Sequence, residues 1–195
     1  MDILPKEFYK RNTLEVAREL LGKVVTREIG TQKISARIVE TEAYAGFDDR
    51  ASHAHTGKTP RNSVMFGPAG FAYVYFTYGL HHLFNVVTEE VNYPSAVLIR
   101  AVEPISGLKF IQENRPERKF HELTNGPAKF TKAFRIDKCF NGIDVTAGKG
   151  IWIEEGESIG KNRIVTGPRI GVGYSEECAE WPRRFFIKDN QFISK

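Results

Sequence analysis

Short runs of alternating apolar and polar residues dominate the first quarter of the chain. Residues 23–29 and 35–44 have strand-type patterns on either side of Gly30, which predicts a β-hairpin. Ahead of this hairpin, apolar positions three and four residues apart predict an amphipathic helix, which Asn12 or Thr13 can cap and Gly22 can end. The chain therefore begins with a helix followed by an antiparallel pair.

A second hairpin is predicted further along the chain. Residues 71–78 are rich in β-branched and aromatic side chains, and residues 82–88 return after a tight turn at Gly79. The apolar run within residues 94–103 predicts a buried strand. Residues 45–69, between the two hairpins, are rich in Gly, Asp, His, Thr, Pro and Asn, which predicts a loop. A loop of this length in a compact domain usually has a function.

The remaining elements are short. We expect helices at 107–114 and after Gly126-Pro127, and strands at 151–154, 169–174 and 184–188. Strands scattered among helices without strict βαβ alternation predict an α+β fold with a mostly antiparallel sheet. With 195 residues and no visible linker, the chain is expected to form a single domain over residues 1–195.

Charge adds one local feature to this picture. The net charge is +4 and the sequence pI is about 9.0. Residues 100–135 hold eight Lys/Arg and four Glu, so their surplus of four equals that of the whole chain. Such a basic segment can attract a polyanion, although a solvated helix face has the same composition.

Composition also narrows the expected compartment. No apolar run approaches the ~20 residues of a membrane helix, and the N-terminus has no signal-peptide pattern. The two cysteines, Cys139 and Cys178, match no metal or redox spacing, which favours reduced thiols in a cytoplasmic protein.

The first candidate for chemistry is the segment Glu40-Thr41-Glu42-Ala43-Tyr44. Alternate residues of a strand share a face, so we expect Glu40, Glu42 and Tyr44 to point the same way. Two partly buried carboxylates at this spacing raise each other's proton affinity, which can prepare one as a general base. Spacing alone nevertheless favours an edge strand with a solvated acidic face.

Aromatic residues form the second candidate. Tyr73 and Tyr75 share one strand face, and Tyr78 lies near the tip of the predicted second hairpin. Core packing is expected for Phe71 and Phe76. An apolar turn tip suits a wedge or a surface on which bases stack, rather than a solvated loop.

The histidines are the third candidate. His53 and His55 form an H-x-H pair in the long loop, but no cysteine is near them, so a zinc site is not expected. His53 is equally suited to hydrogen bonding in a pocket. The glycine-rich segments match no phosphate loop or dinucleotide fingerprint.

Taken together and in order, these segments resemble the alkyladenine (3-methyladenine) DNA glycosylase family, the type with a minor-groove β-hairpin. The resemblance covers nearly the whole chain. It is carried by ARELLGK (17–23), ARIVETEAYAG (36–46), ASHAHTGKTPRNSVMFG (51–67), YVYFTYGLHHLFNVV (73–87), AVLIRAVEP (96–104), NGPAKF (125–130), GPRIGVG and PRRFFI. It implies a curved, mostly antiparallel sheet with flanking helices and a protruding hairpin.

The resemblance also implies roles for individual residues in the chemistry. Glu42 is the counterpart of the family's catalytic base, and Glu40 receives no catalytic role. The damaged base is expected between Tyr44 on one face and His53 with Tyr75 on the other. Asn85 corresponds to the residue that abuts the purine where guanine bears its amino group, and so discriminates against guanine.

Contacts with DNA follow from the same resemblance. Tyr78, assisted by Leu80, is expected to fill the gap left by the flipped nucleotide. Arg100 and Lys129 are expected to contact the DNA backbone. The implied partner is double-stranded DNA containing damaged purines, with no membrane, no obligate protein partner and a monomeric state. The implied setting is the cytoplasm of a microbe, near the nucleoid.

The reaction implied is hydrolysis of the N-glycosidic bond of an alkylated purine, hypoxanthine or ethenoadenine. Water is the nucleophile because no lysine occupies that position, and no metal or organic cofactor is required. One alternative is a non-catalytic lesion- or nucleic-acid-binding module, although a binder needs no carboxylate facing anionic DNA. An N-glycosidase acting on RNA or nucleosides, and a formyltransferase-type domain, are weaker alternatives.

Overall fold

A computed structural model of the chain describes residues 2–77, 79–116 and 118–194. Within these ranges, eight strands form one antiparallel sheet. The strands are β1 (Val24–Ile29), β2 (Gln32–Ala45), β3 (Ala72–Thr77), β4 (His81–Val87), β5 (Ser95–Ser106), β6 (Ile151–Glu154), β7 (Ile164–Gly167) and β8 (Arg184–Ile187). The α-helices are α1 (Lys6–Tyr9), α2 (Thr13–Glu19), α3 (Leu108–Asn114) and α4 (Pro127–Ala133). Short 3-10 helices are η1 (Ser63–Phe66), η2 (Phe120–Glu122), η3 (Lys138–Phe140), η4 (Lys161–Arg163) and η5 (Gly173–Glu180).

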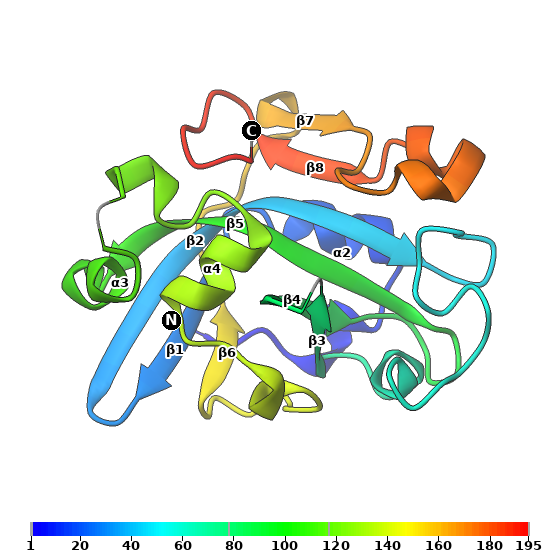
Figure 1. Ribbon diagram of the computed structural model, residues 1–195, viewed down its shortest axis with the longest axis horizontal. Coiled ribbons are helices and arrows are strands. Elements are labelled where there is room, and N and C mark those ends of the chain that lie inside the picture. The colour runs from blue at the N-terminus through cyan, green and yellow to red at the C-terminus, as the bar shows by residue number, and fades with distance from the viewer. Residues whose placement is uncertain (1, 78, 117, 195) are drawn as a thin grey trace.

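The long strands β2 and β5 organise the sheet. The main path runs β3-β4-β5-β2-β1-β6, so β5 borders one edge of β2 along most of its length. The other edge of β2 is shared, because β1 pairs with its first half and β8 with residues Glu40–Glu42. β7 pairs with β8 and lies beyond it (Figure 1). The strand that carries the acidic segment is therefore hydrogen-bonded on both edges.

Helices cover both faces of these long strands. In Figure 1, α4 lies in front of β2 and β5 and α2 lies behind them. The apolar positions of α2 are buried in the main core, and its first turn is capped by Asn12, whose side chain accepts a hydrogen bond from the Leu14 N–H. From α4, Phe130 packs edge-on against Phe84 of β4. The sheet is thus enclosed in an α+β architecture, as predicted.

The two predicted hairpins are confirmed as β1–β2 and β3–β4. The expected strand at 169–174 is wrong, because this segment has irregular structure and enters η5. The segment contains glycines, and Arg169 pairs with Asp49, which lies 120 positions earlier in the chain. These features take the place of pairing with another strand. Phe76 was expected in the core but is 48% exposed, because it faces outward on β3 against His82.

The long loop between the hairpins is held by its own interactions. Asn62, which is buried, donates hydrogen bonds from Nδ2 to the carbonyls of His53 and Gly57. A second, smaller hydrophobic cluster includes Met65 and Phe66 from this loop. The loop therefore presents His53 on a fixed backbone. Among the described residues, no helix has both the length and the hydropathy needed to cross a membrane.

Candidate active site

A cavity of about 390 Å³ opens where β2, β3, β4 and β5 meet the segment at 170–174 and the start of α4. Its lining includes five of the residues that the sequence singles out, which come from four strands and the long loop. They are Tyr44, His53, Tyr75, Asn85 and Arg100. Residues more than fifty positions apart in the sequence thus meet around one space large enough for a small organic group.

Glu42 lies behind the wall of this cavity and is completely buried. Its Oε1 accepts a hydrogen bond from the Ile170 N–H at 2.8 Å and lies 3.1 Å from Nη1 of Arg100. Its Oε2 accepts a hydrogen bond from the Tyr44 hydroxyl at 2.8 Å. All three partners line the cavity. A buried carboxylate needs such partners, and these place it immediately behind the pocket surface.

Glu40 is equally buried but has different partners. Its Oε1 accepts from Nε of Arg184 at 2.6 Å, and its Oε2 accepts from the Ser194 N–H at 2.7 Å. Arg100 lies between the two glutamates, with Nε 3.4 Å from Oε1 of Glu40. The expectation that Glu40 and Glu42 share a face is confirmed. The alternative of a solvated acidic edge is wrong, because β5 and β8 cover both edges of β2 here.

Another part of the cavity lining is an aromatic wall. The rings of His53 and Tyr75 meet edge-on with centroids 4.4 Å apart, and Tyr75 stacks on Tyr73 at 5.4 Å. His53 Nδ1 and the Tyr73 hydroxyl are 2.9 Å apart and form a hydrogen bond. Burial, with a smaller effect of Arg61, lowers the pKa of His53 to about 4. His53 is therefore uncharged at neutral pH.

The tyrosines of the site are also uncharged. Burial raises the pKa of Tyr44 well above 10, with Glu42 adding to the shift, and burial raises the pKa of Tyr73 to about 12. Burial is likewise the main cause that raises the pKa of Tyr75. The tyrosine and histidine rings that face the cavity are consequently neutral.

Asn85 lies at one edge of the cavity, on β4. Its Nδ2 donates a hydrogen bond to the Tyr73 carbonyl at 2.9 Å, and only 4% of the residue is exposed. Asn85 is opposite Tyr73 in the β3–β4 register and opposite Leu98 in β5. The amide is therefore fixed in position rather than free to adapt.

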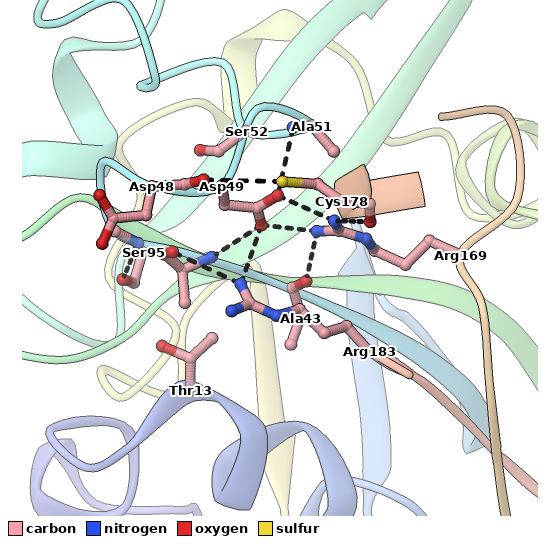
Figure 2. Close-up of polar contacts among 12 residues, drawn as sticks. Thr13, Ala43, Asp48, Asp49, Ala51, Ser52, Ser95, Arg169, Cys178 and Arg183 are labelled. Atoms are coloured by element: carbon pink, nitrogen blue, oxygen red, sulfur yellow. Dashed lines mark hydrogen bonds and ion pairs between the residues drawn. The ribbon is translucent and has the colours of Figure 1, made fainter. Parts of the chain in front are cut away.

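A second buried charge cluster is centred on Asp49 (Figure 2). Asp49 and Arg169 form a bidentate ion pair with oxygen–nitrogen distances of 2.6 and 2.8 Å, and both side chains are 0% exposed. The guanidinium carbon of Arg169 lies 4.7 Å from the centre of the Tyr44 ring. Although burial lowers the pKa of Arg169, its bonds with Asp49 outweigh that effect and raise it overall, so Arg169 stays charged.

The residues expected to contact DNA differ in their surroundings. Arg100 is only 8% exposed, because it is paired with the two glutamates beneath the cavity surface. Lys129, in α4, donates a hydrogen bond to Oδ1 of Asn125. Its pKa is lowered first by burial and then by Arg115, so these two cations lie near each other beside the pocket.

The hairpin tip presents apolar surface. Leu80 is 74% exposed at the turn between β3 and β4. Tyr78, the other residue assigned to this tip, lies outside the described residues.

His55, the second histidine of the long loop, directs Nδ1 at the Phe47 carbonyl. Within the described ranges, no group of three or more His, Cys, Asp or Glu is placed to hold a metal ion. The two cysteines are free thiols.

Sequence reasoning missed Asp49, Arg169 and Ile170. Asp49 lies in a loop in which acidic residues are ordinary, and Arg169 is 120 positions away from it. Ile170 acts through its backbone N–H, to which side-chain identity is irrelevant. The one available signal was the GPRIGVG segment, which the resemblance included without a role for its arginine.

Comparison with known proteins agrees with this geometry. A sequence model of the methylpurine-DNA glycosylase (MPG) family matches residues 7–191. A protein of Desulfitobacterium hafniense (strain Y51), named "Putative 3-methyladenine DNA glycosylase", is 49% identical over 203 residues, covering 100% of this chain and 99% of that protein. Proteins with the same name from Methanocella arvoryzae and Carboxydothermus hydrogenoformans are 49% and 46% identical, and 97% and 99% of their lengths are covered.

These matches extend over the whole fold and over every described element of the pocket, and they define an enzyme of the DNA glycosylase class, which acts in DNA repair. The chain belongs to the methylpurine-DNA glycosylase family. Its substrate is therefore DNA, and the predicted family and enzyme class are confirmed.

Proposed function

We propose that this protein flips a damaged purine out of duplex DNA and hydrolyses its N-glycosidic bond with a water activated by Glu42. The observation that carries this proposal is the buried carboxylate of Glu42 directly behind an aromatic cavity. A base inside a duplex cannot reach such a group, so it has to leave the stack. The relatives' name, 3-methyladenine DNA glycosylase, supports an alkylated adenine as one substrate.

In the proposed step, Glu42 takes a proton from water while the water oxygen bonds to C1′ of the deoxyribose. The bond from C1′ to the base nitrogen breaks, and its electron pair leaves with the base. A cationic 3-methyladenine departs as a neutral molecule, which makes it a good leaving group. The product is an abasic site in an unbroken strand. The negative charge of Glu42 also stabilises the developing oxocarbenium ion.

The neutral aromatic wall supports recognition of a cationic base. A positive purine between Tyr44 and the His53–Tyr75 pair gains about 0.5–2 kcal/mol from the aromatic faces. A protonated His53 would repel the positively charged purine, but the His53 pKa of about 4 keeps the ring uncharged at neutral pH. Asn85 excludes the 2-amino group of guanine in this proposal, which its hydrogen bond to the Tyr73 carbonyl supports.

Contacts with the duplex are proposed at two places. The exposed Leu80 and the neighbouring Tyr78 fill the gap left by the flipped nucleotide. Lys129, with Arg115 close by, meets backbone phosphates beside the pocket. For Arg100, burial against Glu40 and Glu42 favours a role beside the carboxylate over its earlier assignment to the DNA backbone.

The test uses duplexes that carry a single hypoxanthine or ethenoadenine, together with methylated DNA as a source of 3-methyladenine. Each is incubated with the wild type and with Glu42→Gln, treated with alkali and resolved on a denaturing gel. We expect alkali-dependent cleavage, or release of 3-methyladenine, with the wild type only. Cleavage without alkali would contradict a hydrolysis that leaves the strand intact. Lesion binding without excision by the wild type would favour the non-catalytic binding module.

A further inference from the structure

The pair Asp49–Arg169 has no direct place in the proposed chemistry, yet it is the most deeply buried ion pair around the pocket. Both side chains are 0% exposed. An ion pair of this kind contributes little net stability, because desolvating two charges offsets most of their attraction. Its geometry therefore calls for an explanation other than stability.

The contacts of Arg169 lead to the pocket. Nη1 donates to the Ala43 carbonyl at 2.9 Å and Nη2 to the Cys178 carbonyl at 3.1 Å. Its guanidinium lies over the ring of Tyr44, on the strand that carries Glu42. The next residue, Ile170, donates its N–H to Glu42 and lines the cavity. Arg169 thus fixes both the ring on which a base would stack and the amide that holds the carboxylate.

The contacts of Asp49 join this unit to the His53 loop. Oδ1 accepts from the Ala51 N–H at 3.1 Å, and Oδ2 accepts from the Ala45 N–H at 3.3 Å. The Asp49 carbonyl accepts a hydrogen bond from the N–H of Ser52, the residue immediately before His53. Figure 2 shows the bonds of the Asp49 side chain converging on its carboxylate. Asp49 therefore ties together three segments of the chain: the end of β2, the His53 loop and the segment that carries Ile170.

We propose that Asp49 and Arg169 are positioning residues, which hold Tyr44 and the Ile170 amide in the geometry that the reaction requires. This inference rests on the proposed function of Glu42 and Tyr44. It assigns no contact between these two residues and the substrate. A displacement of about 1 Å at such a site costs on the order of 100-fold in rate.

Arg183 offers a matched control. Its Nη1 lies 3.1 Å from the same Oδ2 of Asp49, but its guanidinium stacks on Trp181 instead of Tyr44. Arg169→Lys and Arg183→Lys both keep the positive charge and shorten the fork that pairs with Asp49. Only Arg169→Lys removes the contact behind Tyr44. Asp49→Asn completes the set by removing the shared carboxylate charge.

The experiment measures the single-turnover excision rate on an ethenoadenine duplex at saturating enzyme, with the folded fraction checked at the assay temperature. We expect Arg169→Lys and Asp49→Asn to lower the rate about 10- to 100-fold. Arg183→Lys should stay within about twofold of the wild type. The fluorescence of ethenoadenine, which reports stacking on an aromatic ring, should change in the lesion complex of Arg169→Lys and not in that of Arg183→Lys.

Asp49→Asn leaves two arginines without their charge partner and is the variant at greatest risk of not folding, so the two lysine variants decide the question. Equal rates for folded Arg169→Lys and the wild type would overturn this inference and leave the proposed function unaffected. Equal losses in Arg169→Lys and Arg183→Lys would overturn it too, since they would indicate a general structural role. A wild type that leaves every lesion intact would instead overturn the proposed function, and this inference with it.

Discussion

The two sides of the pocket treat ionisable groups in opposite ways. On the Glu42 side, each buried charge has a partner of opposite sign: Glu42 and Glu40 with Arg100, and Asp49 with Arg169. On the aromatic side, His53 is half-buried, has no partner of opposite charge among the described residues, and is neutral. The difference teaches that the partner decides what burial does: bonds with Asp49 raise the pKa of Arg169 in spite of burial, whereas burial without such bonds lowers the pKa of His53. The aromatic rings thereby offer neutral faces to a base, while Arg100, paired with Glu42, contributes a charged part of the lining.

The strongest way to break this comparison is to neutralise each glutamate in turn. Glu42→Gln should lower the single-turnover excision rate by about 10³-fold, since general-base catalysis contributes roughly 10²- to 10⁴-fold. Glu40→Gln, which removes the same charge two residues away from the same strand, should stay within about tenfold. Urea unfolding of both variants separates a loss of chemistry from a loss of folded protein. Equal losses of rate from the two variants would contradict the separate roles of the two carboxylates.

The aromatic side can be tested through pH. With a folded pKa of about 4 against about 6.5 in the unfolded chain, His53 binds a proton only after unfolding in the intervening range. The unfolded state then holds more protons, so stability is full above pH 6.5 and falls as the pH drops toward 4. His53→Gln should remove about 2 kcal/mol of the difference in unfolding free energy between pH 7.5 and pH 4.5.

Urea midpoints of the wild type and His53→Gln at the two pH values provide this measurement. Comparing the variants cancels the titration of the carboxylates, which both proteins share. If the stability difference between the two proteins is the same at both pH values, His53 does not have the depressed pKa that its burial implies.

The smallest effect is expected where the two sides meet. Tyr44 lines the cavity with its ring and donates its hydroxyl to Glu42. Tyr44→Phe keeps the ring and removes the hydrogen bond, so we expect about a tenfold lower excision rate, as for one bond to a charged group, with unchanged lesion affinity. Tyr93→Phe, which alters an exposed tyrosine, should leave the rate unchanged. A large loss of affinity in Tyr44→Phe would instead indicate that the hydroxyl contacts the base.

Local pattern and turn chemistry were sufficient to predict most of the fold. The hairpin around Gly30 and the strand at 151–154 appear where their patterns place them, because their signals are contained within a few residues. The expected strand at 169–174 failed because Arg169 finds its partner in Asp49, 120 positions away. No local pattern encodes that pairing.

The candidate site likewise has features that local pattern predicts and features that depend on distant parts of the chain. The shared face of Glu40, Glu42 and Tyr44 followed from strand alternation, and it is present in the structure. The burial of both carboxylates did not follow, because it depends on β5 and β8 arriving from distant parts of the chain. Their different hydrogen-bond partners are Ile170, Arg184 and Ser194, none of which strand alternation could connect to them.

The pairing of β2 on both edges has a consequence for the order in which parts of the molecule open. Amides in a strand enclosed by neighbours exchange with solvent hydrogen only in rare, large-scale openings, whereas hairpin tips exchange through local fraying. The segment around Glu42 should thus be among the last to exchange, and the turn at Leu80 among the first. In this arrangement, the turn at Leu80 can open locally while the carboxylate of Glu42 stays in a fixed position in the sheet.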